Sequence, residues 1–243
     1  MKSSRGLVLV AVLSALLTLF VRERVVGPRG AEAVSREFFK IYHSRAIQRD
    51  TAWFGVPVQQ TPTDMWMVQQ IITELKPEVL IETGTLKGGS SLYYASVLHA
   101  LNSEAKVVTV DIEDQLERAK DFEVFRRYVT PVLGSSVAPE TLERVAALVG
   151  DKPALVLLDS DHHKDHVLRE LRLYARFVPV GGYMIVNDTD LNGHPVLPDY
   201  GPGPMEAVEE FLAADDRFVV DRGREKFMLT MYPKGYLKRG KRR

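Results

Sequence analysis

Short apolar segments alternate with helical patterns through the central part of the chain. The apolar segments are rich in valine, isoleucine and leucine and are too short for helices, so each predicts a buried strand. These segments are Val79–Glu82, Val107–Asp111, Val129–Leu133, Ala154–Leu158 and Tyr183–Val186. Helical spacing of apolar residues separates them, over residues 88–101, 114–127, 139–149 and 163–177. Strands that alternate with crossover helices predict an α/β protein with a doubly wound, mostly parallel sheet.

The pattern changes on both sides of this region. Before it, an amphipathic helix is predicted over 31–48, and a second helix begins near Thr61–Pro62. After it, a helix over 204–214 leads to two strands, Phe218–Val220 and Lys226–Met231, which a short polar turn joins as an antiparallel hairpin. A seven-stranded, doubly wound sheet with such a C-terminal hairpin is the Rossmann-like architecture of class I methyltransferases.

An uncharged apolar run occupies residues 7–21. As a helix it would span about 22 Å, less than the roughly 30 Å hydrocarbon core of a bilayer. A cleaved signal peptide, a short signal-anchor and a helix in the membrane interface all stay open, and a buried or frayed terminal helix is the alternative without a membrane. We therefore divide the chain into an N-terminal hydrophobic, anchor-like segment with its linker (1–30), a folded domain (31–237) and a basic tail (238–243).

Charge is distributed unevenly, although the chain as a whole has 32 basic and 32 acidic residues. Residues 1–30 carry a net charge of +4 and residues 233–243 carry +6, which leaves −10 on the body between them. An acidic body with basic ends is unlike a nucleic-acid-binding protein and favours contact of the ends with an anionic membrane face. The sequence has no cysteine, which excludes a disulfide scaffold, a Cys-ligated zinc site and a thiol nucleophile.

A glycine-containing loop follows the first predicted strand. Its G-x-x-x-G-G spacing differs from the dinucleotide-binding pattern and suits a ligand end without phosphates, such as the amino-acid end of S-adenosylmethionine (SAM). A turn that packing alone requires is the alternative. The candidate contacts in and around this loop are Glu82, Gly84, Gly88, Gly89 and Ser90.

The next two strand ends also carry polar groups. Asp111 ends the second strand, 27 residues beyond Gly84, where a carboxylate can accept hydrogen bonds from both ribose hydroxyls. A small polar turn that includes Ser135 follows the third strand and suits the adenine edge. Because ligands bind beyond the carboxyl ends of parallel strands, these positions together predict a nucleoside-binding cleft.

Acidic residues gather at the ends of the fourth and fifth strands, which are neighbours in a doubly wound sheet. Carboxylates that meet at one sheet edge repel one another unless a cation neutralises them, and Asp and Asn oxygens suit Mg²⁺. For Asp161, capping of the following helix is the alternative. His162 lies where it could take a proton from a hydroxyl beside the metal. The predicted metal ligands are Asp159, Asp161, Asn187 and Asp188.

These strand ends, together with a Pro- and Gly-rich loop over 192–204, resemble the cephalosporin hydroxylase family from about residue 35 to 237. Within that family, the mycobacterial rhamnosyl O-methyltransferases of glycolipid synthesis are the most similar. The motifs that carry the resemblance are Ile81–Gly84, Gly88–Ser90, Leu158–His162, Asn192–Pro198 and Gly201–Pro204, with Asp64–Trp66 and Gly235–Leu237.

The resemblance implies an enzyme that requires SAM and Mg²⁺. It implies that Asp159, Asn187 and Asp188 hold the metal, with Asp161 nearby, that Asp159 also borders the cofactor, and that His162 is the general base. The family commonly has Glu-Asp where this chain has Asn187–Asp188. Since Asn is a neutral ligand, we expect metal binding to persist but to be weaker.

We therefore predict a SAM- and Mg²⁺-dependent O-methyltransferase that acts on a sugar hydroxyl, of rhamnosyl type, in a glycolipid or a glycosylated natural product. In this reaction Mg²⁺ lowers the pKa of the acceptor hydroxyl, and His162 takes its proton before in-line attack on the SAM methyl. An O-methyltransferase or hydroxylase for a non-sugar small molecule, and a membrane-tethered binding protein with a decayed metal site, stay as alternatives.

The expected partners follow from the same reasoning. They are a sugar-containing small molecule or glycolipid and a membrane contacted through residues 7–21, with a homo-oligomer left open and no nucleic acid. Because SAM is made in the cytoplasm, we expect the protein at the cytoplasmic face of the membrane, held peripherally or by one N-terminal anchor.

Overall fold

The computed structural model describes residues 12–19, 21 and 27–240. The chain divides into two compact units, Met1–Arg45 and Ala46–Arg243. In the first unit, residues 12–19 are helical, and α2 (Pro28–Ser44) follows with proline at its first turn. None of the helices in the described ranges is long and apolar enough to cross a membrane. Much of the apolar run 7–21 lies outside these ranges, so its role stays a prediction.

Helix α2 differs from the predicted helix over 31–48 at both ends. It begins three residues earlier because Pro28 is favourable in a first turn. It ends at Ser44, and Ala46 adopts a left-handed conformation with φ of 51°, which an α-helix cannot accommodate. The 3₁₀ helix η1 (Ile47–Asp50) therefore forms separately, within the second unit.

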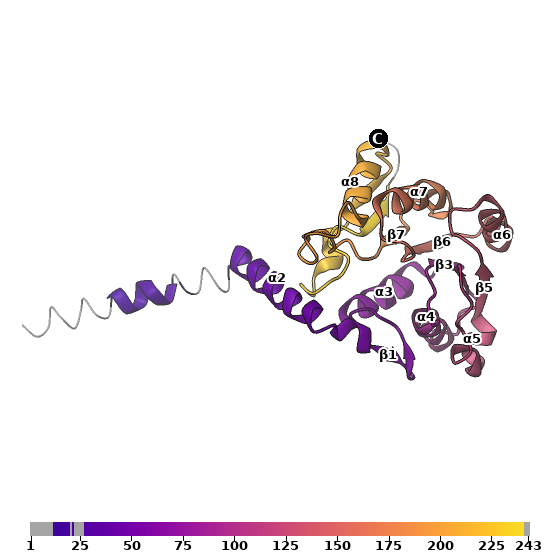
Figure 1. Cartoon of the computed structure of the whole chain (residues 1–243), viewed down its shortest axis with the longest axis horizontal. Helices are drawn as coiled ribbons and strands as arrows, with labels where there is room; N and C mark the ends of the chain where they lie inside the picture. The colour runs from indigo at the N-terminus through magenta and orange to yellow at the C-terminus, as the bar shows by residue number, and fades with distance from the viewer. Residues whose placement is uncertain (1–11, 20, 22–26, 241–243) are drawn as a thin grey trace, which may run out of the picture. The chain divides into compact units, whose positions relative to one another are not determined.

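The second unit contains a seven-stranded sheet in the order β5-β4-β3-β6-β7-β9-β8 (Figure 1). Its five parallel strands are β3 (Val79–Thr83), β4 (Lys106–Asp111), β5 (Val129–Leu133), β6 (Ala154–Leu158) and β7 (Tyr183–Val186). Strand β9 (Tyr236–Arg239) is antiparallel to both β7 and β8 (Phe218–Val220). The order reverses between β3 and β6, and the predicted fold class is confirmed.

Helices cover both faces of this sheet, with α3, α4 and α5 on one face and α6, α7 and α8 on the other (Figure 1). The central strands β3 and β6 are buried at every position, as expected for parallel strands between two helical layers. The helices are α3 (Pro62–Leu75), α4 (Gly89–Ala100), α5 (Glu123–Tyr128), α6 (Pro139–Val149), α7 (Lys164–Tyr174) and α8 (Pro204–Ala214). The short elements are β1 (Ala52–Trp53), β2 (Val56–Pro57), η2 (Ala119–Asp121), η3 (Ala175–Phe177) and η4 (Arg222–Glu225).

The helix predicted over 114–127 is only partly present, as η2 and α5. The carboxylate of Asp111 accepts a hydrogen bond from the amide of Glu113, and that of Asp114 accepts one from the amide of Leu116. Such local side-chain bonds compete with a helix, so the segment starts as a series of turns.

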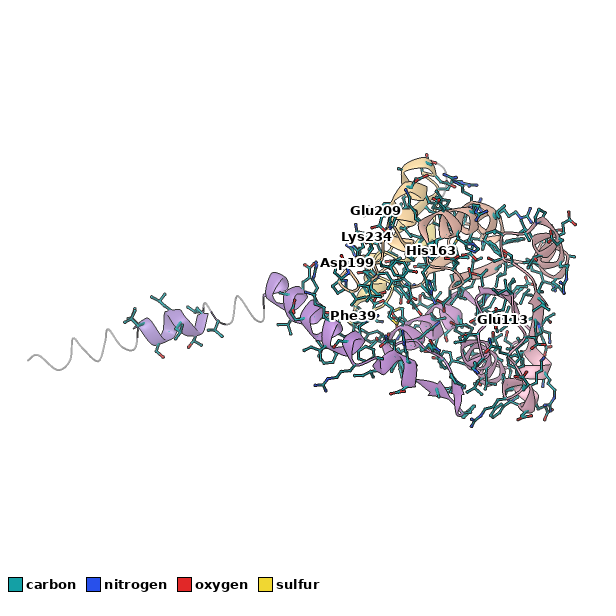
Figure 2. The ribbon with its side chains drawn as sticks, viewed as in Figure 1. Phe39, Glu113, His163, Asp199, Glu209 and Lys234 are labelled. Carbon is teal, nitrogen blue, oxygen red and sulfur yellow. The ribbon has the colours of Figure 1, made fainter. Side chains whose placement is uncertain are left out.

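The prediction of a strand over Lys226–Met231 is wrong. The amide of Met231 donates to the buried carboxylate of Asp64 at 2.8 Å, and the hydroxyl of Thr230 donates to the same carboxylate at 2.5 Å. These bonds draw the segment onto α3 instead of into a strand ladder. The partner of β8 is β9, which includes Lys238 and Arg239 of the predicted basic tail. Figure 2 shows Lys234, just before β9, beside Glu209 of α8, to which its ammonium pairs at 2.8 Å.

Candidate active site

Three titratable side chains meet at the carboxyl ends of β6 and β7. Asp159 and His162 follow β6, and Asp188 follows β7 with a φ of 55°. One ligand atom from each of the three lies within 4.8 Å of the others, and His162 Nε2 is 3.1 Å from Asp188 Oδ2. The neighbouring strand ends therefore bring together the acid and histidine residues that the sequence singles out.

The electrostatics of this group favour a cation. Burial, reinforced by the charge of Asp188, raises the pKa of Asp159 to about 8. The Asn187 side chain is buried, and its amide oxygen has no hydrogen-bond partner in the described part of the chain. An unsatisfied buried amide costs about 1–3 kcal/mol. A hard cation would take the amide oxygen and neutralise the carboxylates, so this donor set fits Mg²⁺.

Gln60 is a member of the site that sequence reasoning missed. Its side-chain amide donates to Asp159 Oδ2 at 3.0 Å, and its backbone is held by the Thr51 hydroxyl. The buried glutamine thus fixes one oxygen of the Asp159 carboxylate. No motif marks it, because it precedes α3 and is 99 residues from Asp159 in the sequence.

Asp161 lies outside the group of three. Its Oδ1 accepts a hydrogen bond from the backbone amide of His163 at 2.8 Å and contacts the ring Nδ1 of the same residue at 2.6 Å. These contacts form a local turn ahead of α7, whose N-cap is His163 without a side-chain cap bond, so Asp161 does not cap the helix as the alternative considered from the sequence has it. A role for Asp161 as a metal ligand stays a prediction.

The glycine loop after β3 is shaped by its neighbours. A Cβ at Gly84 would lie 1.9 Å from the carbonyl oxygen of Asp159, and one at Gly89 would lie 2.1 Å from that of Pro57. Glu82 is buried, and its carboxylate accepts hydrogen bonds from the hydroxyls of Ser91 and Thr109. Close packing therefore accounts for these residues, and their contact with a cofactor stays a prediction.

Asp111 organises the same loop from β4. One carboxylate oxygen accepts the amides of Thr85 and Leu86, each at 2.8 Å. A cavity of about 140 Å³ lies beside it, between the ends of β4 and β5, with Thr85, Asp111 and Leu133 in its wall. The other predicted contacts, which do not line this cavity, are Glu82, Gly84, Gly88, Gly89, Ser90, Ser135 and Asp159.

The Asp111→Ala variant is expected to weaken SAM binding by about 1.5–3 kcal/mol, the range for hydrogen bonds to a charged group. Part of this loss comes from the loop, because the Thr85 and Leu86 amides lose their acceptor. Isothermal titration calorimetry measures it, with Glu117→Ala, at an exposed position outside the cavity wall, as the matched control. Equal affinity in Asp111→Ala and the parent would remove Asp111 from the cofactor site.

The loop between β7 and α8 is tied to the helix that follows it. The Glu206 carboxylate accepts hydrogen bonds from the Asn192 amide at 2.9 Å, the Gly203 amide at 2.7 Å and the His194 ring at 3.0 Å. Burial opposes ionisation of Glu206, but these bonds lower its pKa to about 2. The loop therefore forms a wall next to the group of Asp159, His162 and Asp188.

Solved structures of CmcI share the fold of this chain. The apo-structure of CmcI superimposes with a TM-score of 0.61 at 17% identity, covering 80% of this chain and 78% of CmcI. CmcI in complex with magnesium and SAM gives 0.60 at 18% identity, covering 79% of this chain and 77% of CmcI. The chain thus has the class I methyltransferase fold.

Sequence similarity identifies the family. Residues 45–240 match the family model described as Rhamnosyl O-methyltransferase/CmcI, and the chain belongs to this family. A rhamnosyl O-methyltransferase of Mycobacterium tuberculosis is 35% identical over 221 residues, which cover 86% of both chains. The resemblance stated from the motifs is confirmed.

Proposed function

We propose that this protein is a SAM- and Mg²⁺-dependent O-methyltransferase that methylates a sugar hydroxyl. The observation that carries the proposal is the group of Asp159, His162 and Asp188 at the edge where an α/β sheet of this kind binds ligands. The family match, and the mycobacterial relatives that are named for a rhamnosyl acceptor, support a deoxysugar as the substrate class.

Three residues would hold the metal. Asp159 and Asp188 provide carboxylate oxygens, and Asn187 provides the amide oxygen that has no other partner in the described ranges. A bound Mg²⁺ would lower the pKa of the acceptor hydroxyl. Gln60 keeps Asp159 in one orientation through its 3.0 Å hydrogen bond, as outer groups around metal ligands commonly do.

His162 is the group that would take the acceptor proton. Its side chain is only 28% exposed, and its Nε2 lies 3.1 Å from Asp188 Oδ2, beside the carboxylates that would hold the metal. Much of the remaining rate enhancement would come from holding the hydroxyl and the SAM methyl in line.

Removal of the metal is the direct test of this function. With a soluble rhamnoside and labelled SAM, methyl transfer is expected to fall to background in EDTA and to return when Mg²⁺ is added in excess. Mass spectrometry of the product identifies the methylated sugar oxygen. Transfer that is indifferent to EDTA would leave a metal-independent methyltransferase, and transfer to a non-sugar acceptor alone would overturn the substrate class.

A finer proposal concerns location. The apolar run 7–21 and the +4 and +6 charges of the two ends support a glycolipid acceptor and a site of action at the cytoplasmic face of a membrane. The full chain is expected to sediment with membranes, and a chain that begins at Ala31 is expected to be soluble yet active on a soluble rhamnoside. Full chain found only in the soluble fraction would contradict this proposal.

A further inference from the structure

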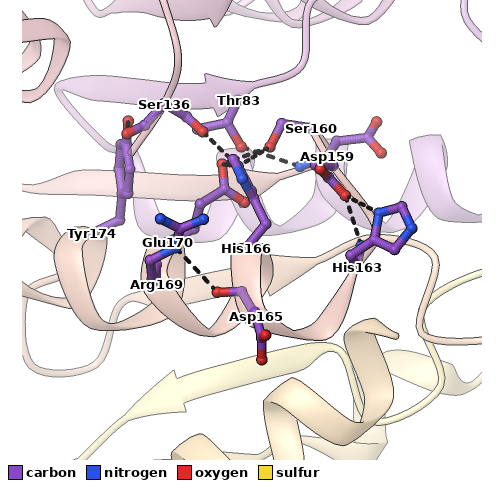
Figure 3. Close-up of polar contacts among 11 residues, drawn as sticks. Thr83, Ser136, Asp159, Ser160, His163, Asp165, His166, Arg169, Glu170 and Tyr174 are labelled. Carbon is purple, nitrogen blue, oxygen red and sulfur yellow. Dashed lines mark hydrogen bonds and ion pairs between the residues drawn. The ribbon is translucent and has the colours of Figure 1, made fainter. Parts of the chain in front are cut away.

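Four polar side chains other than Asp159, His162 and Asp188 meet on the inner face of α7 (Figure 3). His166 and Glu170 come from α7, Ser136 follows β5, and Ser160 follows β6. His166 Nε2 is 3.0 Å from Ser136 Oγ and 3.2 Å from Ser160 Oγ. The Ser160 hydroxyl donates to Glu170 Oε1 at 2.7 Å. We refer to these four residues as the α7 cluster.

The α7 cluster joins two turns that the sheet does not join. Strands β5 and β6 are separated by β4 and β3, so no strand ladder connects their ends. The ring of His166 bridges them through the two serine hydroxyls, and Tyr174 adds a hydrogen bond to the carbonyl oxygen of Ser136 at 2.9 Å. One helix therefore holds both turns.

Packing alone does not explain the charge in this cluster. Glu170 is fully buried, and its Oε2 has no hydrogen-bond partner in the part of the chain that the structure describes. A buried carboxylate is expensive unless it is paired, and an apolar residue would pack with the adjacent Val167 and Leu171 at lower cost. His166 Nε2 lies 3.6 Å from Glu170 Oε1, and this carboxylate raises the pKa of His166.

The two turns have different neighbours in the proposed site. Ser160 directly follows Asp159, whose amide donates to the carbonyl oxygen of Thr83 at 2.9 Å. Ser136 directly follows Ser135, the predicted contact of the adenine edge. A displacement of either serine therefore moves a residue that is proposed to touch the metal or the cofactor.

We propose that His166 and Glu170 are positioning residues that link the metal-side and cofactor-side turns, so that a ligand that orders one turn also orders the other, and SAM and Mg²⁺ strengthen each other's binding. This inference rests on the proposed function, because it takes the metal to lie at Asp159 and the nucleoside near Ser135. Coupling of this kind is reciprocal, and it typically amounts to a 5–150-fold change in affinity (about 1–3 kcal/mol).

Calorimetry of SAM binding with and without saturating Mg²⁺ tests the proposal. In the parent, Mg²⁺ is expected to tighten SAM binding by a factor of about 5–150. In His166→Ala and in Ser136→Ala this factor is expected to fall toward one, while each ligand alone still binds. His166→Gln, whose amide can bridge two hydroxyls, should restore part of it. Arg169→Ala, on the exposed side of α7, is the matched control and should keep the parental factor.

The outcomes separate this inference from the proposed function. If Mg²⁺ tightens SAM binding in folded His166→Ala and Ser136→Ala as much as in the parent, the positioning role is overturned. It is also overturned if the parent transfers methyl groups but Mg²⁺ does not change its SAM affinity. A parent that binds no SAM would overturn the proposed function itself. Should His166→Ala fail to fold, as circular dichroism would show, Ser136→Ala decides, because it removes one hydroxyl and leaves the Glu170 pair intact.

Discussion

Replacing Asp159 by asparagine is expected to reduce methyl transfer by more than about 100-fold while the chain stays folded. The variant removes a charge from the centre of the metal group, and even loss of a residue outside the ligand shell commonly costs 10–100-fold. The asparagine oxygen can still accept the Gln60 hydrogen bond, so the local structure is preserved. Turnover on a soluble rhamnoside measures the effect, and circular dichroism checks the fold.

Magnesium titrations sharpen this test through their pH dependence. Because burial and then Asp188 raise the pKa of Asp159 to about 8, this carboxyl is mostly protonated at pH 7 when no cation is present. Binding of Mg²⁺ at pH 7 must therefore release a proton, and affinity should rise with pH and level off above about 8. Calorimetry in buffers of different ionisation enthalpy measures the number of protons released on Mg²⁺ binding. Parental turnover, or parental proton release, in Asp159→Asn would exclude Asp159 as a ligand.

Asp161→Asn, measured in the same way, separates a metal ligand from a residue that only stabilises the turn before α7. An amide oxygen can still accept the His163 backbone hydrogen bond, so a turn residue loses little. The sequence could not decide between a metal ligand and a helix cap, since an acid three residues after a strand is suited to both. In the structure the His163 amide and ring lie against this carboxylate, which turns it toward the start of α7.

Local composition predicts most of the sheet because its strands depend on their own apolar side chains. Strands β5, β6 and β7 and helices α6 and α8 begin and end where the sequence pattern places them. The segment 226–231 has a strand-like composition, but its backbone amides and hydroxyls are drawn to Asp64, more than 160 residues away. Competition from so distant a buried acceptor is invisible to a pattern of neighbouring residues.

The sequence predicts those features of the candidate site that depend on the order of the strand ends. Asp159 and Asp188 follow neighbouring strands, so topology alone brings them together. Gln60 and the α7 cluster depend on tertiary packing of helices and turns, and neither belongs to a motif. Residues that position the site residues through hydrogen bonds are therefore found only once the fold is known.

His162→Ala is expected to slow methyl transfer by roughly 10²–10⁴-fold, the usual range for loss of a general base. Single-turnover measurements with saturating SAM and acceptor isolate the effect on chemistry. If the ring acts only as a base, Mg²⁺ and SAM should bind the variant nearly as tightly as the parent. His163→Ala, which removes an exposed neighbouring ring, is the matched control and should retain turnover.

The geometry also allows a second role for His162, as a metal ligand. His162 Nε2 lies within ligand distance of the same point as Asp159 and Asp188, so the ring could instead bind the metal. In that case His162→Ala would weaken Mg²⁺ binding as strongly as Asp159→Asn does, and excess Mg²⁺ would recover turnover. A base cannot be replaced by added metal, whereas small exogenous imidazoles can substitute for it. Rescue by imidazole without a change in Mg²⁺ affinity therefore assigns the proton transfer to His162, and full activity of the variant would assign it elsewhere.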